Sequence, residues 1–388
     1  MNSAALHAAR VVRASPPPSA VAHGHYLRTR FFSSLDGLRA LSILAVIWHH
    51  TAAAGAANTL LHQGNQGVSL FFVISGFLIV TLLLRAKARS GTFSLPKFWG
   101  RRTLRILPVY YGVLGLYVVL VVLLEHNPGY RRAFFGNLPA FATFTSNWFV
   151  SLKDPRVIFY FAWSLAAEEQ FYLVWPWFER YLRGAWPLFA ALIVLALTQG
   201  TALAVHSKDL NDLSLPVRMI SSVPAAILLG VILAHLLHSP GAFRVLYAMT
   251  GRRGSATAAF LLTVAALGAR PVLGPARDFV TAAAMMLLVA SCVVREDNDL
   301  MRLLSAPWIA WVGKVSYGMY LLHMLSVNQV RRALAAVHAH SPYLDFIFGT
   351  LLAIGAASLS YLFFESRFLR LKDRLFREDL KSVQSGRV

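Results

Sequence analysis

Long runs of hydrophobic residues, separated by short polar segments, dominate this chain. Apolar runs of about 17–25 residues are long enough for an α-helix to cross a lipid bilayer. The candidate spans are 38–57, 67–84, 107–124, 160–178, 185–205, 217–237, 255–269, 278–294, 313–330 and 344–364. A further apolar stretch, 134–150, is interrupted by Gly136 and Pro139 and is predicted to be interfacial or re-entrant. The pattern therefore predicts an all-α polytopic membrane protein, a bundle of about ten transmembrane helices.

The composition excludes an ordinary soluble protein. Of the 388 residues, 57% are hydrophobic and 14% are charged, whereas soluble domains average about 25% charged residues. The net charge of +20 would suggest a nucleic-acid partner for a soluble protein. In a membrane protein it reports topology instead. We therefore expect membrane lipids, and no nucleic acid, among the partners.

The basic residues predict which way the chain crosses the membrane. With a cytoplasmic N-terminus, ten spans place more than two thirds of the 37 Lys and Arg residues on the cytoplasmic side. Cytoplasmic segments carry such an excess, so we expect both termini in the cytoplasm. We divide the chain into a disordered cytoplasmic tail (1–33), a membrane domain (34–370) and a basic cytoplasmic tail (371–388). The single cysteine, Cys292, leaves no disulfide within the chain, and we expect no metal site.

The first predicted span carries ionisable residues at both ends. In "LDGLRALSILAVIWHH", residues 35–50, Arg39 and His50 are eleven residues apart. In a helix that spacing leaves them within about 20° of one another and about 16 Å apart along the axis, whereas His49 is about 80° off this face. Ionisable groups at membrane depth suggest function. Arg39 could instead be an anchor that extends to the interface, and His50 a hydrogen-bonded interhelical residue.

Two further segments indicate different roles, helix packing in one and phosphate binding in the other. "GVSLFFVISGFLI", residues 67–79, has small residues that favour close helix packing rather than chemistry: Gly67, Ser75 and Gly76. In "KFWGRRTLRILPVYY", residues 97–111, Arg102 and Arg105 lie three residues apart on the cytoplasmic side of the third span. Guanidinium groups bind phosphates with two parallel hydrogen bonds. The alternative is a topology signal in contact with anionic lipid.

Two later spans carry polar stripes. In "WSLAAEEQFYLVWPWF", residues 163–178, Ser164, Glu168 and Tyr172 follow one another at intervals of four. Burying a carboxylate in lipid is costly, so this stripe is expected to face the interior of the bundle. The adjacent Glu169 points elsewhere, and a buried structural ion pair is the alternative role.

The second stripe lies in "GKVSYGMYLLH", residues 313–323. Ser316, Tyr320 and His323 share one helical face, where they could line a site or form a polar seam between helices. Glu365 ends the last span at the cytoplasmic edge, and we expect its role to be structural.

Taken together and in this order, the motifs resemble the acyltransferase-3 family of integral membrane acyltransferases. The resemblance runs from residue 35 to about residue 370. Members have about ten membrane helices and reside in the bacterial cytoplasmic (inner) membrane. They transfer an acyl group, usually acetyl, from cytoplasmic acyl-CoA to a hydroxyl, commonly on a carbohydrate such as a surface polysaccharide or glycolipid. The residues that match the family's motif positions are Arg39, His50, Arg102, Arg105, Glu168, Ser316, Tyr317, Tyr320 and His323.

The resemblance implies a division of labour among these residues. His50 is the candidate general base, because an imidazole titrates near neutral pH, and Glu168 could orient it. Tyr320, His323 and Ser316 are candidates to bind the acceptor.

The donor is expected at the other end of the first span. Arg39, Arg102 and Arg105 face the cytoplasm and would hold the phosphates of CoA, with Arg39 at the interface. The roughly 16 Å from Arg39 to His50 is comparable to the reach of a pantetheine arm.

The sequence is also compatible with other acceptors and with a transporter. The acceptor could be a lipid, an antibiotic or another small molecule, and many family members have an acidic residue where this chain has Ser69. Some members carry a hydrolase-like domain after the last span, which we do not recognise in this sequence. We therefore expect this chain to complete the transfer itself or to pass the group to a separate protein. Intramembrane His and Glu residues would also suit a proton-coupled transporter.

Overall fold

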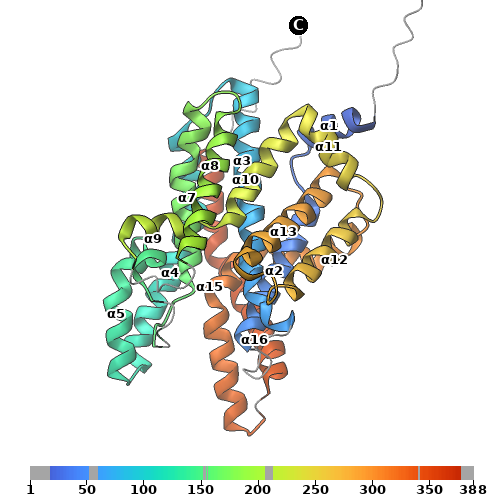
Figure 1. Cartoon of the computed structure of the whole chain (residues 1–388). Helices are drawn as coiled ribbons and strands as arrows, with labels where there is room; N and C mark the ends of the chain where they lie inside the picture. The colour runs from blue at the N-terminus through green and yellow to red at the C-terminus, as the bar shows by residue number, and fades with distance from the viewer. Residues whose placement is uncertain are drawn as a thin grey trace, which may run out of the picture.

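The computed structural model describes residues 18–51, 60–151, 154, 156–205, 213–339 and 341–376. Every regular element within these ranges is a helix, which confirms the all-α prediction. Long helices stand side by side in one bundle, with short helices at its ends and flanks (Figure 1).

The elements follow one another along the chain with few long connections. They are α1 (Pro18–Arg28), α2 (Ser33–Thr51), η2 (Leu60–Gln66), α3 (Gly67–Ser90), α4 (Leu95–Leu124), α5 (Pro128–Ala142), α6 (Ser146–Phe149), α7 (Ala162–Tyr181), α8 (Trp186–Ala204), α9 (Leu215–Ser221), α10 (Ala225–His238), α11 (Pro240–Thr250), α12 (Ser255–Gly268), η4 (Gly274–Ala276), α13 (Arg277–Val294), α14 (Met301–Leu304), α15 (Pro307–Ala336), α16 (Pro342–Ser360), the π-helical turn η5 (Tyr361–Glu365) and α17 (Ser366–Leu375).

Several of these helices can cross a membrane. Five are long and apolar enough, and the number rises to seven if each of two bent pairs, α1 with α2 and α9 with α10, counts as one span. The expected count of about ten is therefore not confirmed. The shortfall has a physical reason: α12 has 14 residues, and α7 and α15 carry the charged and polar residues of the candidate site.

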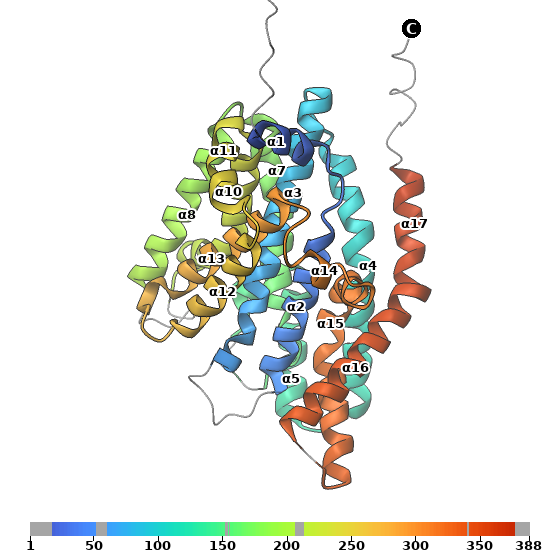
Figure 2. The same cartoon turned by 90° about the vertical axis from the view of Figure 1, so that its right-hand side faces the viewer.

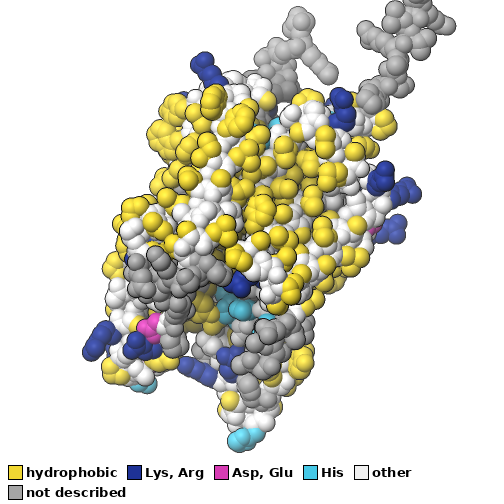
Figure 3. All heavy atoms as spheres, in the orientation of Figure 1, with side chains coloured by type: hydrophobic (Ala, Val, Ile, Leu, Met, Phe, Trp, Pro, Cys, Tyr) yellow, Lys and Arg dark blue, Asp and Glu magenta, His cyan; other side chains and the backbone are white. Residues whose placement is uncertain are grey.

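The outer surface is suited to lipid. Large apolar side chains are exposed on the long helices, among them Leu123 on α4, Ile193 on α8 and Leu351 on α16, each more than half exposed. Figure 3 shows hydrophobic side chains as a broad band across one face, with Lys and Arg gathered mainly at its margins. Apolar patches of this extent mark a surface that is covered in the native environment. The chain is thus a multi-pass membrane protein.

The N-terminal segment is more ordered than its composition suggests. Residues 18–28, which we expected within a disordered tail, form α1, and Tyr26 and Phe32 are buried. Arg85 of α3 donates a hydrogen bond to the Tyr26 carbonyl at 2.7 Å, which ties this segment to the bundle. The prediction of disorder is therefore wrong for residues 18–33, because two aromatic anchors offset the entropy of ordering. Residues 1–17 and 377–388 lie outside the described residues.

The stretch 134–150 is helical through both of its predicted breaks. Helix α5 continues past Gly136 and Pro139 to Ala142. The chain turns instead at Phe144, which has a φ of 53°. Proline in a helix removes one hydrogen bond without necessarily ending the helix, so the predicted break was misplaced.

Glycines let α2 pack tightly in the centre of the bundle. A Cβ on Gly313 of α15 would overlap the Asp36 carbonyl oxygen, and one on Gly67 would overlap the Ser42 carbonyl oxygen. Gly76 and Gly230 meet in the same way between α3 and α10. The predicted packing role of Gly67 and Gly76 is thus confirmed, and small residues bring these backbones into direct contact.

We expect Gly313→Ala to destabilise the protein by about 1–3 kcal/mol, because the added methyl would push α15 away from α2. Thermal unfolding in detergent micelles would measure this as a lower Tm. Gly355→Ala on α16 is the matched control: apart from the neighbouring backbone of its own helix, no described atom lies within 4 Å of the place its methyl would take, and alanine favours helix by about 1 kcal/mol over glycine. Equal Tm changes for the two variants would contradict the packing account.

Candidate active site

A row of polar residues from α2, α4, α7 and α15 runs through the interior of the bundle, and we call it the polar line. Phe161, just before α7, packs on His323. Ser164, further along, contacts Tyr320, which comes earlier on α15. The two helices therefore run in opposite directions, and their polar stripes meet. Two groups define the ends of this line. We call His50 and His323 the histidine pair, and Arg39, Arg102 and Arg105 the arginine cluster.

The histidine pair joins α2 to α15. The ring centroids of His50 and His323 are 4.8 Å apart with their planes inclined at 63°. His323 is fully buried, whereas His50 is mostly buried and keeps a minor exposed fraction. His49 turns away to η2, where its Nδ1 lies 3.1 Å from the His62 carbonyl oxygen. The helix therefore separates the two neighbouring histidines as the spacing predicted, with His50 directed to α15.

Hydrogen bonds fix which ring nitrogen of each histidine carries its proton. The Nδ1 of His50 lies 2.8 Å from the Val46 carbonyl oxygen, and the Nδ1 of His323 lies 2.6 Å from the Tyr320 carbonyl oxygen. A carbonyl only accepts, so each neutral imidazole has its proton on Nδ1 and a free electron pair on Nε2. The Nε2 of His323 is buried, and it has no partner among the described residues. Two basic nitrogens are thus available to a hydroxyl group.

The middle of the polar line connects α7 to α15. The hydroxyls of Ser164 and Tyr320 are 2.6 Å apart, and Tyr320 also donates to the Phe161 carbonyl at 3.1 Å. Ser316 is buried one turn before Tyr320 on the same helix. These contacts fix the register of the two helices.

Glu168 belongs to the arginine end of this line rather than to the histidine pair. It accepts hydrogen bonds from Ser75 of α3 and Tyr172 of α7. Because the Ser164–Tyr320 contact sets the register, Glu168 lies one turn to one side of it and His323 almost one turn to the other, about 10 Å apart along the axis. The expected orientation of His50 by Glu168 is therefore not observed; His50 bonds to Val46 instead. Ser75, which we interpreted as a packing residue, is a hydrogen-bond donor.

The arginine cluster lies beside Glu168. The Arg102 guanidinium stacks on the Tyr172 ring, with its carbon 3.8 Å from the ring centre. Arg105 interacts electrostatically with both Arg102 and Arg39. The Nε of Arg102 is buried, and no acceptor for it is found in the part of the chain that the structure describes. Buried donors are normally satisfied, so this atom is suited to an anionic ligand.

Carboxylates balance the charge of these arginines. Asp36 forms a 3.0 Å ion pair with Arg39, and both Glu168 and Glu169 act electrostatically on Arg102. Glu365, at the end of the π-helical turn η5, interacts electrostatically with Arg105. Asp36 was not singled out from the sequence, although its spacing of three residues from Arg39 on α2 is typical of a helical ion pair. Glu365 comes close to Arg105 only because η5 packs against α4.

The structure places Arg39 near the start of α2. Figures 1 and 2 both show α2 beginning well inside the bundle, below the level of α1. The extended residues 29–32 lead the chain inward, and Leu35 and Leu38 beside Arg39 are buried. Helices α1 and α2 are separate and are bent by 71°, so α2 starts deeper in the bundle than α1, while the position of Arg39 at the membrane interface stays a prediction.

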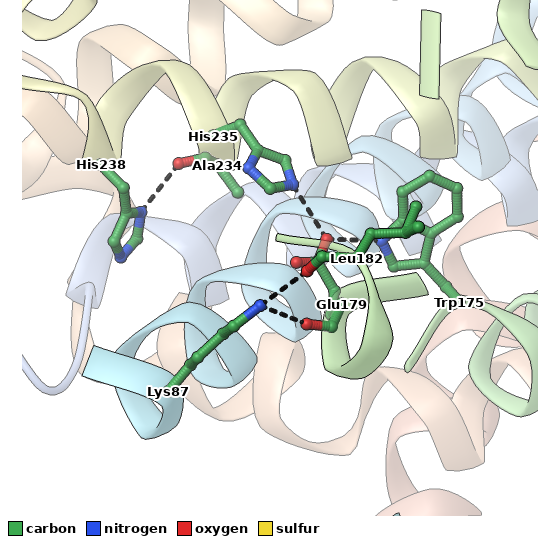
Figure 4. A network of polar contacts seen from close by, with 7 residues as sticks. All are labelled: Lys87, Trp175, Glu179, Leu182, Ala234, His235 and His238. Atoms are coloured by element: carbon green, nitrogen blue, oxygen red, sulfur yellow. Dashed lines mark hydrogen bonds and ion pairs between the residues drawn. The ribbon is translucent and has the colours of Figure 1, made fainter. Parts of the chain in front are cut away.

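A second buried polar network lies outside this line (Figure 4). His235 and Trp175 both bind Glu179 Oε1, each at 2.9 Å, and Lys87 donates to the Glu179 carbonyl at 2.8 Å. Glu179 is eleven residues from Glu168 along α7, or about 16 Å. The network joins α3, α7 and α10 near one end of the bundle, and no sequence motif indicated it.

The described residues contain no group of three or more His, Cys, Asp or Glu side chains that could hold a metal ion.

Comparison with known proteins identifies the family. The model of the family described as an acyltransferase domain, Acyl_transf_3, matches residues 32–365. The chain belongs to this family. The match includes the whole polar line, and it confirms the resemblance to the acyltransferase-3 family that the motifs indicated.

Curated relatives carry O-acetyltransferase names. A Staphylococcus aureus (strain COL) protein, provisionally named an O-acetyltransferase, is 28% identical over 371 residues, which are 88% of this chain and 58% of that protein. YrhL of Bacillus subtilis (strain 168), provisionally named a peptidoglycan O-acetyltransferase, is 29% identical over 76% of this chain and 48% of its own length. The Listeria monocytogenes peptidoglycan O-acetyltransferase OatA is 34% identical over 38% of this chain and 24% of its own length. The chain thus spans little more than half the length of the first of these relatives, and no solved structure matches it.

Proposed function

We propose that this protein is an integral membrane O-acyltransferase. It transfers an acyl group, acetyl in the first instance, from cytoplasmic acyl-CoA to a hydroxyl of a carbohydrate acceptor such as a surface polysaccharide or glycolipid. Family membership and the O-acetyltransferase names of the relatives support O-acetylation. The names of OatA and YrhL make peptidoglycan the first acceptor to test.

The observation that carries this proposal is the order of groups along the polar line. The arginine cluster, with its buried Arg102 Nε, offers charge-assisted hydrogen bonds to the phosphates of CoA. The histidine pair lies about 16 Å further along α2. That separation lets the nucleotide stay among the arginines while the pantetheine arm carries the thioester to the histidines.

The reaction then needs one proton transfer and one acyl transfer. The Nε2 of His50 takes the proton of the acceptor hydroxyl as its oxygen attacks the thioester carbonyl carbon. The new ester C–O bond forms and the C–S bond breaks, and the thiolate of CoA leaves and takes up the proton. His323 Nε2 and the Tyr320 hydroxyl hold the acceptor beside His50, with Ser316 behind them, while Glu168 keeps Tyr172 under Arg102.

The acceptor enters from the histidine side. His50 keeps a minor exposed fraction, whereas His323 is fully buried, and Figure 3 shows histidine side chains in a recess at the lower edge of the hydrophobic band. An acceptor that reaches this recess does not have to pass the arginine cluster. The two substrates thus approach from opposite ends of the polar line.

We further propose ten spans in the cytoplasmic membrane of a bacterium, with both termini in the cytoplasm. Five apolar helices, two bent pairs, α7, α12 and α15 make up this number. An alkaline phosphatase reporter fused at Gly254 is expected to be inactive and one fused at Gly274 active, because α12 would separate them across the membrane. The same reporter activity at both positions would remove α12 from the count.

The decisive experiment is acyl transfer in isolated membranes. Membranes that contain the protein are supplied with radiolabelled acetyl-CoA, and the label is followed into peptidoglycan, other glycans and lipids. We expect alkali-labile label in glycan, as an ester requires. Label in lipid alone would move the acceptor to the lipid class. Solute movement with no consumption of acetyl-CoA would favour a transporter.

A further inference from the structure

The hairpin of α15 and α16 holds the end of α2 that carries His50. The Trp48 ring contacts two aromatic residues one turn apart on α16, with centroid distances of 5.1 Å to Phe346 and 5.9 Å to Tyr343. Gly349 of α16 packs against Val327 of α15, so the two helices of the hairpin are close. The last turn of α2 is therefore enclosed by this hairpin.

Arg331 of α15 makes a more specific contact with the same turn. Its Nη2 donates to the backbone carbonyl of His50 at 3.1 Å, and its Nε donates to Asp345 Oδ2 at 3.0 Å. Asp345 lies in the first turn of α16 and is 1% exposed. The rigid guanidinium fork thus bridges α2 and α16, a geometry that lysine cannot reproduce.

The bonded carbonyl belongs to the last described turn of α2, Ser33–Thr51. A hydrogen bond from a charged guanidinium to such a carbonyl is stronger than one from a neutral donor. The imidazole of His50 depends on this same turn, because its Nδ1 bonds to the Val46 carbonyl.

We propose that Arg331, held by Asp345, is a positioning residue that fixes the last turn of α2 and thereby the imidazole of His50. The assignment of a catalytic effect rests on the proposed function. The structural role of Arg331, which is to fix the last turn of α2, does not depend on that function. The two roles are therefore tested separately.

The kinetic test compares two neighbouring arginines. Arg331→Gln is expected to lower kcat about 10–100-fold, since a displacement of about 1 Å at a reacting group costs this much, and to leave KM for acetyl-CoA unchanged. Arg331→Lys keeps the charge and should recover only part of the loss. Arg332→Gln makes the same charge change at an exposed neighbour and should keep the wild-type kcat. A wild-type kcat for Arg331→Gln, or an equal loss for Arg332→Gln, would overturn the proposal.

Two measurements separate positioning from simple loss of folding. Arg331→Gln takes a cation away from a buried carboxylate, which is itself destabilising. The double variant Arg331→Gln with Asp345→Asn removes both charges and should fold while keeping the low kcat. A double variant with wild-type kcat would mean that Arg331 only neutralises Asp345, and the proposal would fail.

Hydrogen exchange tests the structural part without any activity. In Arg331→Gln, backbone amides of residues 46–51 should exchange faster than in the wild type, whereas in Arg332→Gln they should not. This comparison remains valid if the protein transfers no acyl group, so failure of the proposed function can be recognised separately. Unchanged exchange in Arg331→Gln would overturn the positioning role.

Discussion

Replacing His50 with alanine is expected to lower acyl transfer about 100- to 10,000-fold, the range that a general base supplies. The Nδ1 proton of His50 is committed to Val46, so Nε2 is the basic atom, and it faces the α15 side of the bundle. Alanine removes this atom without adding bulk. Transfer from radiolabelled acetyl-CoA in membranes, normalised to the amount of folded protein, is the measurement.

His49→Ala is the matched control for this prediction. His49 is the adjacent residue on the same helix, and its Nδ1 bonds to the His62 carbonyl of η2. The His49→Ala variant should therefore retain most of the wild-type rate of acyl transfer. Loss of acyl transfer in His49→Ala, together with retained transfer in His50→Ala, would show that the histidine pair is not the reacting end of the polar line.

Arg102→Ala is expected to raise KM for acetyl-CoA about 10- to 100-fold, with a smaller change in kcat. A hydrogen bond to a charged group contributes about 1.5–3 kcal/mol, and the buried Nε of Arg102 is the donor best placed to make one. The loss affects donor binding more than chemistry, because the histidines lie about 16 Å away. Initial rates over a range of acetyl-CoA concentrations would measure it.

Lys97→Ala provides the control for nonspecific electrostatic attraction. Lys97 lies in the first turn of the same helix, α4, and is exposed. Its removal takes away one positive charge without touching the buried cluster, so KM should stay close to the wild-type value. Equal increases in KM for both variants would mean that the arginines attract CoA only through overall charge.

Individual positions within helices could be predicted well from the sequence. The spacing of Arg39 and His50 placed them on one face of a single helix, and the structure has both in α2. Intervals of four residues indicated the stripe of Ser164, Glu168 and Tyr172, and the structure shows the bond between the last two. Such inferences hold because helical geometry is local and regular.

Contacts between helices could not be predicted in the same way. The sequence suggested that Glu168 orients His50, but the register of α7 against α15 places Glu168 with Ser75 and Tyr172. The register depends on where glycines such as Gly313 let backbones meet, and no local rule fixes it. For the same reason Glu365 and Arg331 were not found as neighbours of Arg105 and His50.

The sequence by itself determined the membrane class, the all-α architecture and the family, and it supplied the candidate site residues, because hydrophobicity, helical period and motif order are properties of the chain alone. The tertiary structure alone decided the bend between α1 and α2, the partner of His50 and the place of Glu168. Those outcomes depend on how separate helices tilt, bend and slide against one another, and this is set by close packing among residues that lie far apart in the sequence.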